Sequence, residues 1–242
     1  MKLFSYISNF LFPSRCIICD RVTEKDVHLC EDCTPLLMHP SSKKSRCPVC
    51  CLDIKECSCR ANRYFSRSAV PFKGTQTARR SVYKLKFSAR LDKVSPFAEY
   101  MNIALRERDI LGSVDIITYI PMSERSQRKR GFNQAQLLAE ELSELNGIPC
   151  EKLLYKYQNT PTQHSMTSSI GRSGNVLGIY EPLKEKTDLI KNKRILITDD
   201  ILTTGNTLNE AAKTLLIFGA ADVYCTAAVS TEKKIKKNLI DL

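Results

Sequence analysis

The chain has 242 residues, of which 43% are hydrophobic and 26% are charged. This length allows one sizeable domain with a small additional module, and the composition excludes a chain that is disordered throughout. The 37 lysines and arginines exceed the 26 aspartates and glutamates, giving a formal net charge of +11. This charge favours anionic partners such as phosphates or nucleic acid, although a solvated basic surface would give the same excess.

The first residues, MKLFSYISNFLFP, are apolar enough to be mistaken for a signal peptide. However, two serines and an asparagine interrupt the apolar run, no small-residue cleavage site follows, and Pro13 comes directly after it. No other segment approaches the length of a membrane span. We therefore expect a cytoplasmic protein without a membrane span.

Nine of the eleven cysteines lie within residues 16–59. In a C-x-x-C pair one turn can present both thiolates to a tetrahedral Zn²⁺, and a second pair closes a structural site. A disulfide framework is the alternative, but the remainder of the chain is typical of a reducing cytosol. The first predicted zinc quartet consists of Cys16, Cys19, Cys30 and Cys33.

A second predicted quartet follows with a less regular pattern. It ends in C-x-C, and Cys51 adds a thiol beside it, so the ligands could be exchanged, the site could be empty, and the two ribbons could be consecutive or interleaved. Zinc would replace the hydrophobic core that about 50 residues cannot build alone. We expect this zinc-ribbon module to span residues 1–63. The second quartet consists of Cys47, Cys50, Cys57 and Cys59.

Residues 64–242 alternate between strand-like and helix-like patterns and are expected to form the larger domain. Strands are expected at residues 68–72, 116–120, 195–198 and 223–229. Helices are expected to start at Ser95-Pro96, to run from Asn133 to the Asn146-Gly147 cap, and to cover residues 208–219. This alternation predicts a parallel sheet with helices on its faces, which binds ligands at the carboxyl ends of its strands.

Residues 194–208, RILITDDILTTGNTL, place two aspartates after a buried strand and a threonine-glycine turn before a helix. Free backbone N–H groups and the positive helix end favour a phosphate monoester in such a turn. The carboxylates could accept hydrogen bonds from sugar hydroxyls or hold Mg²⁺ through water. An ordinary strand-to-helix turn, with acidic residues near the helix start, is the alternative.

A basic loop is expected within residues 120–134, IPMSERSQRKRGFNQ, between a strand and a helix. Such a loop could bind a diphosphate leaving group, although runs of basic residues are commonly just solvated. The candidate diphosphate-binding residues are Arg125, Arg128, Lys129 and Arg130.

The strand, the acidic pair and the T-T-G-x-T turn resemble the 5-phosphoribosyl-1-pyrophosphate (PRPP) signature of type I phosphoribosyltransferases. Thr198 departs from that signature, because the family usually has an aliphatic residue there. The resemblance implies that Asp199 and Asp200 are catalytic residues that contact the ribose hydroxyls, with Mg²⁺ bound alongside PRPP. The ribose-phosphate-binding residues that it implies are Thr203, Thr204, Gly205, Asn206 and Thr207.

With the cysteine pairs ahead and this signature behind, the R-G-F-N-Q string at residues 130–134 resembles the ComF family of competence-associated proteins. K-L-K-F at residues 84–87 and the Q…R-x-x-N-V-x-G-x-Y run at 163–180 match further family elements, the latter with Met166, Tyr180 and one extra residue departing from the pattern. The resemblance covers nearly the whole chain. It implies an α/β fold with a parallel sheet flanked by helices, type I phosphoribosyltransferase-like, and a small N-terminal zinc-ribbon module.

Several functions agree with these motifs. The ComF resemblance implies DNA uptake or natural transformation, with PRPP or a related sugar phosphate, single-stranded DNA and other DNA-uptake proteins as partners. If the site is catalytic, it transfers ribose 5-phosphate with loss of pyrophosphate. A salvage or biosynthetic phosphoribosyltransferase of unknown acceptor and a non-catalytic nucleic-acid adaptor are the alternatives, and the fold does not decide among them.

Aromatic residues lie among the basic segments at residues 79–93 and 125–130. Tyr83, Phe87 and Phe132 could stack on the bases of a single strand. However, Tyr83 and Phe87 are four residues apart on one helix face, a spacing that is more typical of a buried core.

Overall fold

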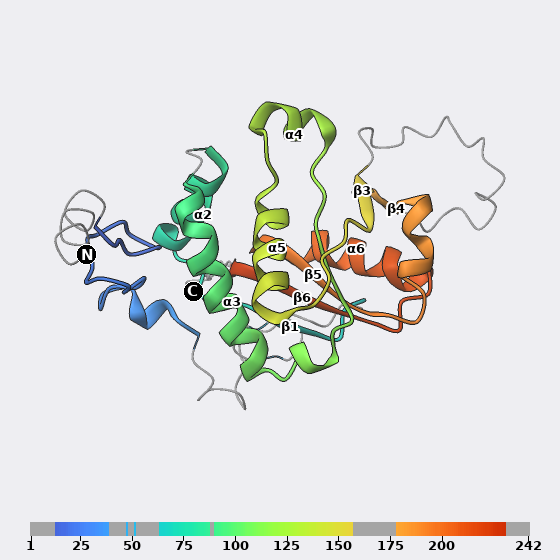
Figure 1. Cartoon of the computed structure of the whole chain (residues 1–242), viewed down its shortest axis with the longest axis horizontal. Helices are drawn as coiled ribbons and strands as arrows, with labels where there is room; N and C mark the ends of the chain where they lie inside the picture. Colours follow the sequence, from blue (N-terminus) through green and yellow to red (C-terminus); the bar gives the residue numbers. More distant parts are fainter. Residues whose placement is uncertain are drawn as a thin grey trace, which may run out of the picture.

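The computed structural model describes residues 13–38, 47, 51, 63–87, 90–156 and 178–230. These residues form a parallel four-stranded sheet with helices on both faces (Figure 1). Across the sheet, the strands are β1 (Arg67–Ala69), β6 (Asp222–Ser230), β5 (Arg194–Leu202) and β2 (Ile116–Tyr119). The predicted parallel sheet is therefore confirmed, and β5 is one of its two central strands.

The helices divide between the two faces because side chains alternate along each strand. Leu196 and Tyr224 belong to one buried cluster, with side chains of α3 (Val94–Glu107) and α5 (Gln134–Asn146). Ile195 and Val223, their direct neighbours in the chain, belong to a second cluster, with α6 (Asn206–Ile217). The remaining described elements are α2 (Gln76–Phe87), α4 (Glu124–Arg130), the antiparallel pair β3 (Leu154–Lys156) and β4 (Tyr180–Pro182), and the 3-10 helices η1 (Thr34–Leu36), η3 (Leu91–Lys93), η4 (Leu111–Ser113) and η6 (Lys184–Leu189).

Three of the differences from the expected element boundaries concern β1, α3 and β5. Strand β1 ends at Ala69, because Pro71 lacks the N–H that a sheet ladder requires. Helix α3 begins at Val94 with Lys93 as its N-cap, since η3 leads directly into it, so Ser95 lies inside the helix and does not cap it. Strand β5 continues to Leu202, so the two aspartates lie within the strand and not beyond its end.

The cysteine-rich segment packs directly on the larger domain. Ile17, Ile18 and Leu29 belong to the same buried cluster as Phe97 and Met101 of α3. In Figure 1 the segment lies beside α2. The two parts therefore share one core on this face of the sheet, while the boundary at residue 63 stays a prediction. Within the described part of the chain, no helix combines the length and the apolar character that crossing a membrane requires.

Candidate functional site

The acidic pair lies on β5 near the carboxyl edge of the sheet. Asp200 is buried, with 7% of its surface exposed, and Asp199 is half-buried. The Asp200 N–H donates to Asp199 Oδ1 over 2.8 Å. The pair directly precedes Ile201 and Leu202, which pack into the first and the second buried cluster respectively.

Asp199 faces the side of the sheet that α6 covers. Burial raises the pKa of the Tyr180 hydroxyl well above its usual value, and the negative charge of Asp199 raises it further. Burial also raises the pKa of the Cys225 thiol, and the charge of Asp199 raises it further. Both side chains belong to the cluster that includes α6, so Asp199 brings its charge to that side of the sheet.

The turn between β5 and α6 has the geometry of an anion cradle. Thr203, Thr204, Asn206 and Thr207 are exposed, whereas Gly205 is buried and has a φ of +76°, which strongly favours glycine. The Asn206 N–H donates to Thr204 Oγ1 over 3.4 Å. The first N–H groups of a helix have no acceptor within it, so they and the threonine hydroxyls offer donors to a ligand.

The expected basic loop is instead the short helix α4. Ser123 accepts a hydrogen bond from the Ser126 N–H as N-cap, and Gly131, with a φ of +82°, ends the helix. Glu124 lies in the first turn and the basic residues Arg128, Lys129 and Arg130 lie in the last, which complements the helix dipole. These local signals explain why residues 124–130 are helical.

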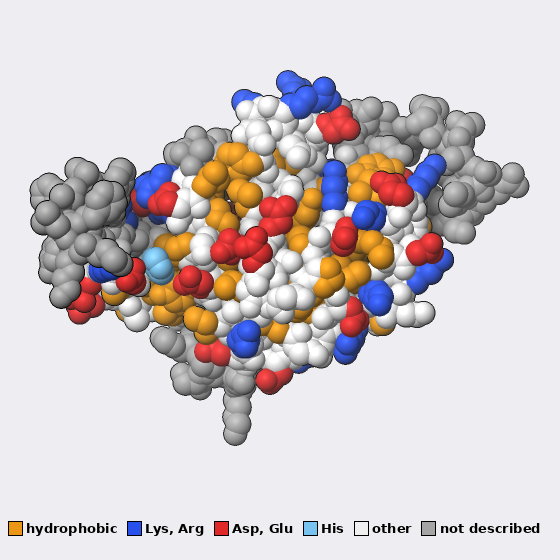
Figure 2. Space-filling model, in the orientation of Figure 1, with side chains coloured by type: hydrophobic (Ala, Val, Ile, Leu, Met, Phe, Trp, Pro, Cys, Tyr) orange, Lys and Arg blue, Asp and Glu red, His pale blue; other side chains and the backbone are white. Residues whose placement is uncertain are grey.

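Helix α4 stands away from the sheet at the end of two extended segments (Figure 1). Its basic side chains gather at the tip of this projection (Figure 2). Arg125 and Lys129 are exposed, Arg128 pairs with Glu124 over 2.8 Å, and Arg130 donates to Gln134 Oε1 over 3.3 Å. The α4 projection therefore holds its four candidate residues together, but apart from the turn at residues 203–207.

The base of the α4 projection nevertheless adjoins the acidic pair. The Ile120 N–H donates to the Thr198 carbonyl over 3.0 Å, which continues the pairing of β2 with β5 beyond Tyr119. The Asn133 side-chain amide donates to the Ile120 carbonyl over 3.0 Å. Both ends of the α4 projection are thus fixed at the strand next to β5.

The Gly178–Tyr180 element packs against α6, on the side of the sheet that Asp199 faces. A side chain at Gly178 would require the Glu210 carboxylate, the end of a flexible side chain on α6, to move. Tyr180 is 1% exposed, and its carbonyl accepts a hydrogen bond from Thr214 Oγ1 over 3.4 Å. The preceding candidates in this family element, Gln163, Met166, Arg172, Asn175 and Val176, lie outside the described residues.

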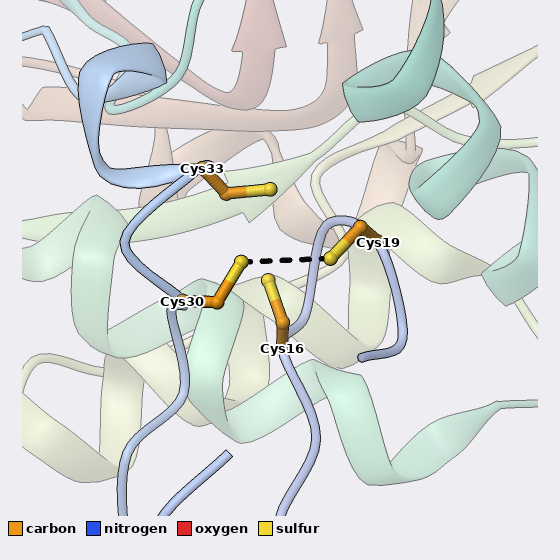
Figure 3. Close-up of side chains that lie close together, drawn as sticks. All are labelled: Cys16, Cys19, Cys30 and Cys33. Atoms are coloured by element: carbon orange, nitrogen blue, oxygen red, sulfur yellow. Dashed lines mark hydrogen bonds between the residues drawn. The ribbon is translucent and has the colours of Figure 1, made fainter. Parts of the chain in front are cut away.

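The first cysteine quartet converges on one point (Figure 3). The sulfur atoms of Cys16, Cys19, Cys30 and Cys33 all lie within 4.8 Å of one another, and those of Cys19 and Cys30 are 3.6 Å apart. A Zn–S bond of about 2.3 Å in a tetrahedron places sulfur atoms about 3.8 Å apart, which matches this arrangement. These four residues could therefore hold a metal ion such as zinc, in a closed, structural site.

The backbone prepares one of these thiols for metal binding. Burial opposes ionisation of Cys16, but hydrogen bonds from the Cys30, Cys19 and Ile18 backbone outweigh it and lower the pKa of the thiol to about 7. Since the thiolate is the form that binds zinc, this environment favours the metal-bound state.

The second cysteine quartet is described only in part. Cys47 is buried and its carbonyl accepts a hydrogen bond from Arg108 over 3.2 Å, while Cys50, Cys57 and Cys59 lie outside the described residues. The Cys51 thiol donates to the Ser68 carbonyl over 3.1 Å. Cys51 therefore attaches this segment to β1, and the second zinc site stays a prediction.

Comparison with known proteins connects these features. Residues 128–241 match the family model for the phosphoribosyl transferase domain, and they include the acidic pair and the turn. The DNA utilization protein YhgH of Salmonella typhimurium is 27% identical over 213 residues, 86% of each chain. Competence protein F of Haemophilus influenzae is 30% identical over 45% of this chain and 47% of its own. Competence protein ComFC of Bacillus subtilis is 28% identical over 58% of this chain and 48% of its own.

These relatives and the matched domain support the ComF family. Its fold class is confirmed as that of a type I phosphoribosyltransferase-like domain, with a cysteine cluster at the N-terminus that suits a zinc ribbon. Among solved structures, the allosteric regulatory enzyme of purine biosynthesis aligns with a TM-score of 0.40 and 19% identity. That alignment covers 61% of this chain and 30% of the enzyme.

Sequence reasoning missed two residues that the structure places at the site. The Arg63 guanidinium donates to the Thr204 carbonyl over 2.7 Å, although the two residues are 141 positions apart in the chain. Tyr180 was noted only as a departure from the family pattern, yet its ring is buried close to Asp199. A contact over this separation leaves no local signal, so the sequence offered nothing from which to predict the role of Arg63.

Proposed function

We propose that this protein binds PRPP or a related ribose phosphate together with Mg²⁺, and that it acts on single-stranded DNA during DNA uptake in the cytoplasm. The observation that carries the proposal is the turn at residues 203–207, with its left-handed Gly205 and exposed hydroxyls, directly after the acidic pair of β5. The matched phosphoribosyl transferase domain includes this segment. The relatives named for competence and DNA utilization support the DNA part of the proposal.

Each part of the site has a defined task in this proposal. The turn donates hydrogen bonds to the 5-phosphate, and the dipole of α6 favours its negative charge. Asp199 and Asp200 accept hydrogen bonds from the ribose hydroxyls or from water on Mg²⁺. Bound Mg²⁺ would neutralise charge on the diphosphate. If transfer occurs, these residues accelerate it by holding the ribose carbon in line with an acceptor.

The α4 projection supplies positive charge for phosphates. Its four basic residues could close on the diphosphate only by moving toward the turn, whereas they already stand where a polyanion can reach them. We therefore propose that Arg125, Arg128, Lys129 and Arg130 bind the diphosphate, DNA phosphates or both. Removing their charge separates these roles, because PRPP and DNA affinities can be measured independently.

Helix α2 supports a nucleic-acid partner. Tyr83 is 48% exposed, and the exposed side chains of Arg79 and Arg80 lie four and three positions before it, on the same helix face. An aromatic ring with neighbouring basic side chains is the combination that binds single strands by stacking and charge. The exposure of Tyr83 thus favours the stacking interpretation over the buried one for this residue.

The zinc-binding cysteines are proposed to be structural. Residues 1–63 would form the zinc-ribbon module, with the first quartet around one ion and the second around another. Because Ile17 and Ile18 belong to the core that α3 helps to form, the first ion would stabilise the larger domain as well as the module.

Calorimetry with PRPP in the presence of Mg²⁺ tests the ribose-phosphate site. Replacing Asp199 and Asp200 together with asparagine should abolish binding and preserve the fold, because the change removes charge and keeps shape. The matched control is Glu185→Gln with Asp188→Asn, which removes two exposed charges from η6 at the opposite edge of the sheet. Wild-type protein that produces no heat with PRPP or ribose 5-phosphate would show that the site assignment is wrong.

A pyrophosphate-release screen over nucleobases, run beside DNA binding at low salt, distinguishes the alternatives. A salvage phosphoribosyltransferase should turn over with one base and bind DNA weakly. The proposed DNA-handling protein should bind single-stranded DNA whether or not any base supports turnover. Failure of both assays would favour a partner-dependent adaptor.

A further inference from the structure

Arg63 lies at the end of the cysteine-rich segment in the sequence, but its side chain lies against the turn at residues 203–207. Besides the bond from Nη2 to the Thr204 carbonyl, Nη1 would be 2.9 Å from a Cβ at Gly205 and Cζ would be 3.4 Å from it. The guanidinium therefore covers the Cα of Gly205. The positive φ strongly favours glycine at 205, and a Cβ there would also require the guanidinium to shift.

Neighbouring residues hold Arg63 in this position. The Tyr64 N–H donates to Asn209 Oδ1, in the first turn of α6, over 2.7 Å. The Arg63 Cζ lies 5.9 Å from the centroid of the Phe65 ring. Residues 63–65 thus lie along the start of α6. The Arg63 side chain is held near its backbone by the bond of Tyr64 and at its guanidinium by the bond to Thr204.

The charge of Arg63 also reaches the side of the sheet that Asp199 faces. Burial is the main cause that raises the pKa of Cys225, the charge of Asp199 adds to it, and the charge of Arg63 opposes it. The charges of Arg63 and Asp199 therefore have opposite effects on the pKa of the same buried thiol. Both charges are therefore near enough to Cys225 to affect its thiol.

The bond to Thr204 also determines the direction of a backbone N–H that could donate a hydrogen bond to a phosphate. In a trans peptide the C=O of one residue and the N–H of the next point in opposite directions, and no described peptide bond is cis. By holding the Thr204 carbonyl, Arg63 directs the Gly205 N–H to the other side of the turn. Within the described residues this N–H has no acceptor, so it is available to a ligand.

We propose that Arg63 is a positioning residue of the ribose-phosphate site, which holds the turn so that the Gly205 N–H faces the 5-phosphate and which adds positive charge beside that phosphate. This inference rests on the proposed function and extends it to a residue outside the matched domain. The segment that joins the cysteine-rich module to the larger domain is, on this view, part of the ligand site.

The test compares Arg63→Gln with Arg63→Lys by calorimetry, using ribose 5-phosphate and PRPP with Mg²⁺. Arg63→Gln should weaken both ligands by about tenfold, the effect expected when a hydrogen bond from a charged donor is lost. Arg63→Lys keeps a donor and the charge, so it should recover affinity to within about threefold of wild type. The control is Arg67→Gln, a half-buried arginine at the other end of the sheet that donates to the Arg108 carbonyl.

Thermal unfolding of each variant distinguishes an effect on the ligand site from loss of the fold. Wild-type affinity in folded Arg63→Gln protein would overturn the role of Arg63 and leave the proposed function intact. Equal loss in the lysine and glutamine variants would also overturn it, because a purely structural role gives no rescue by a conserved charge. If wild-type protein binds neither ligand, the proposed function fails and the role of Arg63 fails with it.

Discussion

Lys93 Nζ lies 2.7 Å from Asp20 Oδ1, and only 2% of the Lys93 side chain is exposed. The same ammonium donates to the Ile17 carbonyl over 2.8 Å and to Ser81 Oγ over 3.1 Å. A buried lysine is tolerated only when its charge and donors are satisfied, and here all three acceptors are supplied. Lys93 therefore joins the first cysteine pair to α2 and η3 through a buried polar contact.

Asp20→Asn should destabilise the protein more than Lys93→Met. The aspartate variant leaves Lys93 buried without its counter-charge, at a cost of about 3–5 kcal/mol, whereas methionine removes the charge and keeps the volume. Asparagine tolerates the left-handed backbone at position 20, where φ is 65°. Chemical denaturation of both variants measures the difference.

Asp32→Asn is the matched control for this comparison. Asp32 pairs with Arg21 in the same segment, but 65% of each side chain is exposed, so the loss should stay below about 1 kcal/mol. An Asp20→Asn variant as stable as Asp32→Asn would contradict the importance of the buried contact.

Removal of zinc should destabilise the larger domain as well as the cysteine-rich segment. Because Cys16 and Ile17 share a buried cluster with Phe97 and Met101, loss of the ion should lower the main thermal transition and not add a separate one. Metal analysis, with thiol counting before and after chelation, measures the stoichiometry. Two transitions, with the larger one unchanged, would show that the parts fold independently.

Cys150 provides an internal reference for that thiol count. Burial, with Glu140 and Glu151 nearby, raises the pKa of its thiol to about 12. At pH 8 only about one molecule in ten thousand carries the thiolate there, so alkylation should be slow and should rise tenfold with each pH unit. Peptide mapping should then show that the thiols released by chelation belong to the cysteine-rich segment.

Local patterns in the sequence were sufficient for much of the larger domain. The alternation of strand-like and helix-like segments predicted the parallel sheet, and Asn133 and Gly147 are the caps of α5 as expected. The T-T-G-x-T turn opens α6 as expected, with Gly205 as its left-handed cap. In each case the signal lies within one turn or one strand, where propensity and capping decide the structure.

Contacts between distant residues were not predictable in this way. Lys93 was one residue of a basic segment, and only the approach of Asp20 makes it a buried anchor. In the sequence Arg63 is only the last residue of the cysteine-rich segment, and its contact with Thr204 exists only in the folded chain. The helical form of residues 124–130 was missed for another reason, because the charge pattern was interpreted as a loop although Ser123 and Gly131 carry cap signals.

Thr198→Val should stabilise the protein. Thr198 is completely buried, and its hydroxyl has no hydrogen-bond partner within the described residues. Valine has the same shape without the polar group, so about 1 kcal/mol should be gained, which raises the melting temperature by about 2–4 °C. The substitution also restores the aliphatic character that the PRPP signature usually has at this position.

Thr226→Val is the paired control, since Thr226 lies directly opposite Thr198 on β6 and is equally buried. Its hydroxyl donates to the Ala69 carbonyl over 2.9 Å, so valine there should lower the melting temperature. Stabilisation by Thr226→Val, or destabilisation by Thr198→Val, would contradict this account of the two hydroxyls.

Removing the charge of the α4 projection should weaken single-stranded DNA binding and reduce its dependence on salt. Each phosphate contact with a single strand contributes about 0.7 to the slope of log affinity against log salt. Replacing Arg125, Arg128, Lys129 and Arg130 with glutamine should therefore lower the slope by up to about 3. A mobility series over salt concentration measures both affinity and slope.

The control for this last experiment removes four exposed lysines elsewhere on the molecule, namely Lys152, Lys184, Lys191 and Lys193. Its net charge changes by the same amount, so a general electrostatic attraction would lower the affinity of both variants equally. A specific role for the α4 projection requires the larger loss of slope in the α4 variant alone. Equal losses would attribute the attraction to the overall charge of +11. Diphosphate binding would then be the remaining proposed role of the α4 projection.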